Sequence, residues 1–214
     1  GSLNMDLVVS VKKRPCIGET ILGSDVLFVG GGKGANQAIA AACLGGQVTM
    51  VGKIGDDPFG EILRSNLATA GVNTSGIQVE VGVSSGMAFI TVDGDGDNQI
   101  IVSPGANSRL SPADITTHTD LISQAKVLLL QLEIPIPTVI AAAELAHQQG
   151  VTVVLDPAPA QPLPEKLLKM VDFLTPNEHE AATLSGQPIT DLRTAKLAAA
   201  KLMRLGCRNV ILKL

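Results

Sequence analysis

The chain has 214 residues, a formal net charge of −4 and 45% hydrophobic residues, which excludes a disordered chain and suits one domain. No basic block occurs, which argues against a dedicated nucleic-acid-binding protein. Tyr and Trp are absent and Phe occurs only four times, so recognition by aromatic stacking is nearly excluded and a polar ligand must be held by hydrogen bonds and charge.

Strand and helix signals alternate in the first part of the chain. The predicted elements are strand 7–11, strand 21–29, helix 35–44, strand 48–54 and helix 59–70. Three strands without intervening helices follow, at 77–81, 87–92 and 99–102, and resemble an antiparallel patch. Together with segment 21–29 these strands are expected to form a small separate sheet.

After Pro112 the alternation of strand and helix returns. The predicted elements are helix 112–124, strand 127–132, helix 137–149, strand 151–155, a short helix near Lys166, strand 171–174, helices 177–184 and 192–205, and strand 209–214. This order predicts an α/β fold with a doubly wound, mostly parallel sheet and helices on both faces. Both ends of the chain look cut, because the last strand lacks an outer helix, so we expect a fragment of a longer protein.

Membrane and redox signals point to the cytoplasm. No apolar run reaches the roughly 18 to 20 residues that a membrane span requires, and the first ten residues do not form a secretory signal. Cys16, Cys43 and Cys207 form no zinc or redox motif and are typical of buried or half-buried reduced thiols. We therefore expect a cytoplasmic protein with no membrane partner.

Polar residues near strand ends are the first site candidates, because ligands of parallel sheets bind beyond the carboxyl ends of the strands. Four such residues follow predicted strands, namely Asp56, Glu133, Asp156 and Asn177. Near the start of the chain, Asn4 and Asp6 alternate on an extended segment and therefore point the same way. A buried Asp that accepts from two hydroxyl groups is a common way to hold a polyol. For each of these residues a helix cap or a surface acid is the alternative.

Residues 30–36, with the sequence GGGKGAN, open a helix. The glycines let the backbone approach a ligand, and the helix start offers N–H groups to an anion or hydroxyl, while Lys33 adds a cation. The segment is not a Walker A loop, because Gly34 follows the lysine. Gly30-x-Gly32-x-x-Ala35 fits a loose dinucleotide fingerprint with Asp56 as the ribose-binding acid. A nicotinamide-dependent oxidoreductase and a purely structural glycine turn therefore both stay open.

Two acidic motifs also have structural explanations. Residues 93–98 (DGDGDN) imitate a calcium loop but lack its Gly and its final Glu, so they predict a hairpin turn. Asn177-x-x-Glu180 begins a predicted helix and suits an N-terminal cap. Because residues three apart share a helix face, the same pair also suits a phosphate or its Mg²⁺ shell.

Five groups of residues resemble, in order, the signatures of the ribokinase-like (PfkB) carbohydrate kinases. They are Asn4-x-Asp6, residues 31–38 (GGKGANQA), residues 104–107 (PGAN), residues 131–135 (QLEIP) and Asn177-x-x-Glu180. The third and fourth groups resemble the ribokinase branch in particular. The resemblance implies an α/β domain over residues 1–214, incomplete at its C-terminus, with lid strands from about 17–29 and 77–102. It also implies transfer of the γ-phosphoryl group of ATP to the 5-hydroxyl of D-ribose, with Mg²⁺ and a monovalent cation (K⁺).

The resemblance also implies roles for individual residues. Sugar contacts fall on Asn4, Asp6, Gly32, Lys33, Gly34, Asn36 and Glu133, a nucleotide contact on Asn177, and organisation of Mg²⁺ through water on Glu180. The family's Gly-Ala-Gly-Asp segment, with its catalytic base and anion hole, does not occur here, so no catalytic residue is assigned and this chain alone is expected to be inactive. The lid is implied to pair with a second copy in a homodimer. Another sugar kinase of the family, such as a fructokinase, and a non-catalytic sugar-binding fragment remain alternatives.

Overall fold

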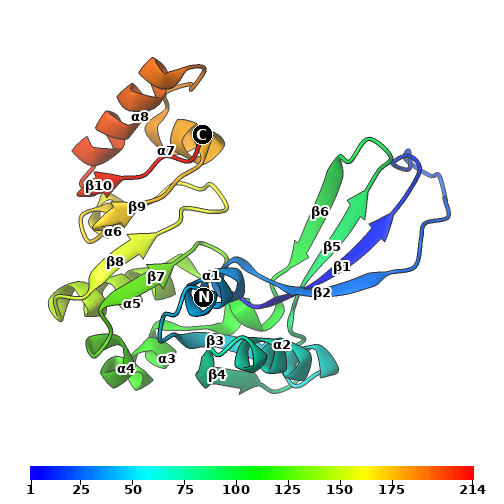
Figure 1. Ribbon diagram of the computed structural model, residues 1–214, viewed down its shortest axis with the longest axis horizontal. Coiled ribbons are helices and arrows are strands. Elements are labelled where there is room, and N and C mark those ends of the chain that lie inside the picture. The colour runs from blue at the N-terminus through cyan, green and yellow to red at the C-terminus, as the bar shows by residue number, and fades with distance from the viewer. The chain divides into compact units, whose positions relative to one another are not determined.

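The computed structural model describes residues 1–214, which form two compact units (Figure 1). The first unit comprises residues 2–109, and the second comprises Gly1 and residues 110–214. Each unit has its own sheets and helices.

The first unit contains two sheets. Its elements are β1 (Asn4–Ser10), β2 (Leu27–Gly31), α1 (Lys33–Cys43), β3 (Thr49–Gly55), α2 (Pro58–Thr69), β4 (Asn73–Glu80), β5 (Gly86–Val92), β6 (Asn98–Ser103) and the 3₁₀ helix η1 (Gly105–Arg109). One sheet has the order β2-β1-β5-β6, drawn as the blue and green arrows in Figure 1. β1 pairs antiparallel with β2 and parallel with β5, and β5 pairs antiparallel with β6. The other sheet is the parallel pair of β3 and β4.

The core of the first unit is built from β1, both helices and the β3–β4 pair. Its buried side chains are Leu3, Met5, Ala35, Ala38, Met50, Ile54, Leu63, Leu67, Val72 and Ile77. Leu3, just before β1, and Met5 alternate with Asn4 and Asp6. Because successive side chains of a strand point to opposite faces, one face of β1 enters the core and the other carries the polar pair.

The second unit is a parallel sheet with helices packed against it. Its elements are α3 (Pro112–Thr117), α4 (Thr119–Ser123), β7 (Val127–Leu130), α5 (Ile136–Gln148), β8 (Thr152–Leu155), α6 (Glu165–Leu168), β9 (Phe173–Leu174), α7 (Glu178–Ser185), α8 (Leu192–Arg204) and β10 (Asn209–Val210). The strand order is β10-β9-β8-β7, and all neighbours are parallel. α5 packs on β7 and β8, and α8 packs on β10. The predicted α/β class with parallel sheets is therefore confirmed. No helix of the chain combines the length and the apolar character needed to cross a bilayer.

Some predicted elements differ from the structure. Of the predicted strand 21–29 only the end belongs to β2, and residues 17–26 form no strand. The strand predicted at 77–81 pairs with β3 instead of joining the antiparallel patch. The reason is that β3, α2 and β4 form a β-α-β unit, whose two strands pair in parallel. The predicted helix 112–124 is divided at His118 into α3 and α4.

The three cysteines are free thiols, as predicted. Cys207 is buried, and burial raises the pKa of its thiol. Cys16 and Cys43 are exposed, so the expectation that they are at least half-buried is wrong. Cys16 lies in the irregular segment before β2, and Cys43 is the last residue of α1, where neither is covered by a neighbouring element.

A hydrogen-bond network around Asp57 fixes the start of α2 against the loop that leads into β5. Asp57 caps α2 by accepting from Gly60 N–H at 2.8 Å, and its carboxylate also accepts from the amide and hydroxyl of Ser85 at 2.7 and 2.8 Å. Ser85 Oγ accepts from Gly55 N–H at 3.0 Å. Burial raises the pKa of Asp57, but the hydrogen bonds, those from Ser85 first, lower it more, so the pKa lies below its ordinary value of 3.8.

We expect Asp57→Ala to lower the free energy of unfolding by about 2 kcal/mol at neutral pH, because it removes a helix cap and the acceptor of Ser85. Since folding depresses the pKa of this carboxyl, its contribution is present above the unfolded-state pKa and is lost as the pH falls through the lower folded-state value. Urea unfolding should therefore show the difference between wild type and variant shrinking in acid. Asp95→Ala, at an exposed turn position, is the control, and a difference that does not change with pH would contradict this account.

Candidate functional site

Asn4 and Asp6 share one face of β1, and glycine stands beside Asn4 on both neighbouring strands. In the strand register Asn4 lies opposite Gly31 of β2 and opposite Gly86 of β5. A Cβ atom at Gly31 would lie 2.5 Å from Asp6 Oδ2, and one at Gly86 would overlap Asn4 Oδ1. The two glycines therefore leave room for polar side chains that a larger residue would displace.

Asn107, in η1, holds the start of β1 through three hydrogen bonds. Its Oδ1 accepts from Leu3 N–H at 2.9 Å, and its Nδ2 donates to Leu3 O at 2.9 Å and to Asn4 Oδ1 at 2.8 Å. Asn107 is 1% exposed and Asn4 is 4% exposed. The motif at residues 104–107 includes Asn107, but no role was predicted for this side chain, because its partners lie about a hundred residues away in the chain.

The glycine-rich turn packs directly against β1. Gly32 is the N-cap of α1 with φ 92°, and a Cβ atom there would lie 2.8 Å from Asn4 N. A side chain is therefore excluded both by the positive φ and by the close approach. At the start of α1, Gly34 N–H donates to Ser2 Oγ at 3.1 Å and Ala35 N–H donates to Ser2 O at 2.9 Å. Two amides that we expected to face a ligand are thus used by Ser2.

The first unit holds all but one of the predicted sugar-contact residues. Asn4 and Asp6 lie on β1, and Gly32, Lys33, Gly34 and Asn36 form the start of α1. The Asn36 side chain is exposed, and Lys33 is half-buried. The start of α1 lies beside the polar residues of β1, because Gly31 and Gly32 both approach β1 closely.

The other predicted residues lie in the second unit, beyond the carboxyl ends of its parallel strands. Glu133 follows β7 and is half-buried. Asp156 follows β8, and its Oδ1 pairs with Lys213 Nζ at 3.0 Å. Asn177 follows β9 and is the N-cap of α7. This edge of the sheet therefore collects the polar groups, as the rule for parallel sheets predicts.

Asn177 and Glu180 form a capping box, as one of the two sequence interpretations predicted. Glu180 N–H donates to Asn177 Oδ1 at 2.8 Å, while Glu180 Oε2 accepts from Asn177 N–H at 2.8 Å and Oε1 accepts from Asn177 Nδ2 at 3.1 Å. Glu180 is 6% exposed. Both carboxylate oxygens are therefore engaged, which fits contact with a hydrated cation through water better than direct ligation. No group of three or more His, Cys, Asp and Glu side chains is arranged to hold a metal ion.

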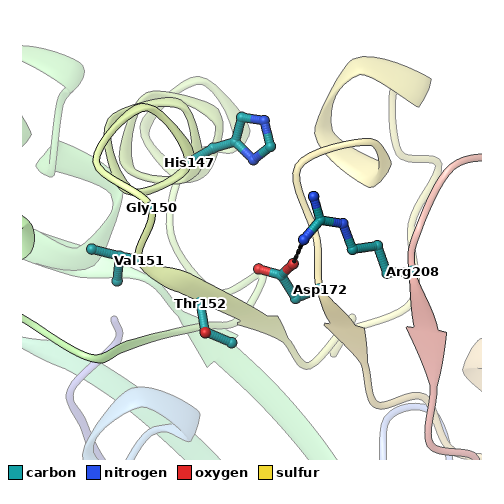
Figure 2. Close-up of a pocket in the computed structure, with 6 residues that line it drawn as sticks. All are labelled: His147, Gly150, Val151, Thr152, Asp172 and Arg208. Carbon is teal, nitrogen blue, oxygen red and sulfur yellow. Dashed lines mark hydrogen bonds and ion pairs between the residues drawn. The ribbon is translucent and has the colours of Figure 1, made fainter.

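A polar hollow of about 150 Å³ lies at the opposite edge of this sheet, at the amino ends of its strands (Figure 2). Asp172, just before β9, accepts from Arg208 at 2.8 Å and from Val153 N–H at 2.9 Å. His147 and Thr152 complete the polar lining. Because Asp172 neutralises Arg208 and joins β8 to the start of β10, these contacts stabilise the sheet and stand apart from the predicted ligand residues.

The dinucleotide interpretation of the glycine-rich turn is wrong. That fingerprint requires a strand, a helix and a second strand parallel to the first in one sheet. Here β2 precedes the turn and pairs antiparallel with β1, while β3, which follows α1, pairs only with β4 in another sheet. Asp56 accepts from Gly82 N–H at 3.0 Å. The turn therefore belongs to a different architecture.

The hairpin interpretation of residues 93–98 is confirmed. Val92 pairs with Asn98 at the end of the β5–β6 ladder. Asp93 Oδ1 accepts from the amides of Asp95 and Asp97 at 3.1 and 3.0 Å, and Asp93 Oδ2 pairs with Arg14 Nε at 2.9 Å. The first acid of the motif therefore closes a turn.

Comparison with known proteins covers the entire chain. Residues 1–214 match the family model described as pfkB family carbohydrate kinase. The bifunctional ribokinase/ribose-5-phosphate isomerase A of Fructilactobacillus sanfranciscensis is 44% identical over 202 residues, which cover 94% of this chain and 37% of that protein. The ribokinase of Bacillus subtilis is 45% identical over 184 residues, covering 86% of this chain and 62% of that protein.

Solved structures agree with the sequence comparison. A structure of Arabidopsis thaliana ribokinase complexed with ribose and ATP has a TM-score of 0.91 and 34% identity, and covers 100% of this chain and 71% of its own. This chain thus spans 37% and 62% of the length of the two relatives above and 71% of this neighbour.

We expect Gly86→Ala to lower the free energy of unfolding by about 1–3 kcal/mol, because the added methyl group meets Asn107 Nδ2, Asn4 Oδ1 and Leu3 O, which are held by one another. Thermal or urea unfolding measures the change. Gly94→Ala, where the nearest atom is Lys12 O at 3.2 Å, is the control with a smaller effect. Equal stability of the Gly86→Ala variant and wild type would show that this contact is not tight.

Proposed function

Because the chain belongs to the pfkB family of carbohydrate kinases, we propose that the longer protein containing it is a ribokinase. Its reaction transfers the γ-phosphoryl group of ATP to the 5-hydroxyl of D-ribose. The observation that carries this proposal is the pair of Asn4 and Asp6 on one face of β1, cleared on both sides by Gly31 and Gly86. An amide next to a carboxylate supplies a donor and an acceptor for adjacent hydroxyl groups of a polyol.

The proposed sugar contacts extend from this pair. They are Asn4, Asp6, Gly32, Lys33, Gly34, Asn36 and Glu133. Gly34 contributes through the shape of the turn, since its amide is paired with Ser2. Lys33 brings a positive charge to the start of α1, where the helix dipole adds to it. The carboxylates of Asp6 and Glu133 accept hydrogen bonds from hydroxyl groups.

The proposed nucleotide contacts lie in the second unit. Asn177 contacts a phosphate of ATP, and Glu180 holds water of a hydrated Mg²⁺, consistent with a carboxylate whose two oxygens already accept from Asn177. Mg²⁺ supplies charge neutralisation on the phosphates. A monovalent cation such as K⁺ is part of the same proposal, which places the enzyme in the cytoplasm with its ATP supply. The chain alone is expected to be inactive, because the family's Gly-Ala-Gly-Asp segment does not occur in its sequence.

The reaction is tested with the full-length protein. ADP release with Mg²⁺ and K⁺ should depend on D-ribose and should be followed with ribose, 2-deoxyribose, fructose and nucleosides as acceptors. Turnover of fructose but not ribose would favour the fructokinase alternative. Ribose binding by calorimetry without ADP release would favour a non-catalytic sugar-binding protein.

We expect Asp6→Ala in the full-length protein to weaken ribose binding about tenfold or more, because a hydrogen bond to a charged group contributes roughly 1.5–3 kcal/mol. Calorimetry with ribose measures the dissociation constant. The melting temperature should stay near that of wild type, since Asp6 lies outside the apolar core of the first unit. Asp95→Ala is the control for loss of a carboxylate, and an unchanged ribose affinity of the Asp6→Ala variant would remove Asp6 from the site.

The sheet β2-β1-β5-β6 also supports a homodimer. On the face that carries Asn4 and Asp6, the large apolar side chains of Leu27, Val29, Ile100 and Val102 are 62%, 49%, 52% and 48% exposed. Exposed apolar side chains on both outer strands of one sheet face indicate an interaction surface. We propose that a second copy of the chain covers this face with its own sheet.

We expect Ile100→Lys to shift the full-length protein from dimer to monomer, because a charge within the proposed interface would be buried without a partner. Sedimentation at micromolar concentration measures the mass. Ile101→Lys is the matched control, because the neighbouring residue of β6 points to the other face. A dimer that withstands Ile100→Lys would show that this face is not the interface.

A further inference from the structure

We propose that Asn107 sets the direction of the Asn4 side-chain amide, so that Asn4 acts on the ligand as a hydrogen-bond donor and not as an acceptor. Asn107 is thus a positioning residue that acts through Asn4. The proposal rests on the proposed function, because it specifies how one residue of the same site recognises its sugar.

The main chain determines the orientation of the Asn107 amide. The oxygen and nitrogen of a side-chain amide are usually assigned from their partners. Here the partners leave no choice, because a main-chain N–H can only donate and a carbonyl can only accept. Leu3 N–H at 2.9 Å requires Asn107 Oδ1, and Leu3 O at 2.9 Å requires Asn107 Nδ2.

Asn107 in turn determines the orientation of Asn4. The second hydrogen of Asn107 Nδ2 points to the Asn4 amide at 2.8 Å, so the facing atom must be the acceptor, Oδ1. A reversed Asn4 amide would place two N–H groups face to face. Since the two side chains are 1% and 4% exposed, water cannot relieve that conflict, and the reversed orientation is strongly disfavoured.

The donor end of Asn4 is left for a ligand. Asn4 Nδ2 makes no hydrogen bond within the chain and is not sealed from solvent. Gly86 contributes to this arrangement, because any side chain there would overlap both Asn107 Nδ2 and Asn4 Oδ1. The Asn4 amide therefore cannot be displaced toward β5 without breaking the contact with Asn107.

On this face of β1, one residue can then act only as a hydrogen-bond donor to the ligand and the other only as an acceptor. Asn4 donates, and the carboxylate of Asp6 accepts, so adjacent hydroxyl groups are bound with one as acceptor and the other as donor. A ligand that carries an ammonium group at the position facing Asn4 offers only donors and is rejected. The site thus discriminates a neutral polyol from an amino sugar, beyond simple complementarity of shape.

Two readouts test the proposal in the full-length protein. In the free protein, side-chain amide exchange by NMR should be slow for Asn107 and faster for Asn4, because only the Asn4 hydrogens lack an acceptor. Asn4→Asp keeps an acceptor toward Asn107 but removes the donor, so ribose affinity should fall tenfold or more at an unchanged melting temperature. A series of singly amino-substituted riboses should include one that the Asn4→Asp variant binds better, relative to ribose, than wild type does.

The Asn107→Ala variant tests whether Asn107 positions Asn4 for the sugar or only stabilises the fold. It should raise the KM for ribose about tenfold and leave the KM for ATP unchanged, and Asn4→Ala/Asn107→Ala should bind ribose no more weakly than Asn4→Ala alone. Asn98→Ala, at an exposed position of β6, is the control. If the Asn107→Ala variant does not fold, the ribose affinity of Asn4→Asp and the amide exchange rates still test the proposed orientation of Asn4.

Three results would overturn the proposal: slow exchange of the Asn4 amide, wild-type ribose affinity in Asn4→Asp, or additive losses in the double variant. Absence of ribose binding by wild type would instead defeat the proposed function. The exchange rates need no sugar, so they test the amide orientation in either case.

Discussion

One buried side chain, that of Asn107, attaches Leu3 and Asn4, where β1 begins, to η1 through three hydrogen bonds. These hydrogen bonds can form only because Gly86 has no side chain. The turn before α1 can pack against β1 only because Gly32 has none. The position of Asn4 is therefore set by the Asn107 side chain and by the close approach of two glycine positions. Because the interior is close-packed, the Asn4 side chain is held in one place. A specific ligand contact requires a side chain that is fixed in this way.

The glycines at the start of α1 act mainly through packing. The N–H groups at this helix start were expected to face an anion or a hydroxyl group, yet Ser2 accepts from the amides of Gly34 and Ala35. Their absent side chains instead bring the helix against β1 and leave Asp6 its room. In the second unit, Asn177 and Glu180 likewise have a structural role, because they form hydrogen bonds with one another as a helix cap. The pair lies at the carboxyl edge of the sheet.

The local sequence pattern predicted whether most segments form a helix or a strand. It did not predict which strands pair with one another. The Ala-rich run of α1 and the Asp-Gly repeat after β5 have strong local signals, and both were predicted correctly. The pairing of β4 with β3 depends on the path of α2, which no strand pattern encodes. The motif at residues 104–107 pointed to Asn107, but its role was not predicted, because its partners Leu3 and Asn4 are brought to it only by the folded chain. Asn4 and Asp6 were accessible from sequence, since their alternation already predicts a shared face.

β1 connects two very different environments. It runs without interruption from Asn4, which is buried, to Ser10, which is exposed, and it is paired with both neighbours over residues 4–8. Its paired residues hold both ends of the strand in one register with the neighbouring strands. If a ligand at Asn4 changes the affinity of the outer sheet for a second copy, assembly changes the affinity for the ligand by the same factor. Ligand binding at the inner end and pairing at the outer end therefore involve the same strand.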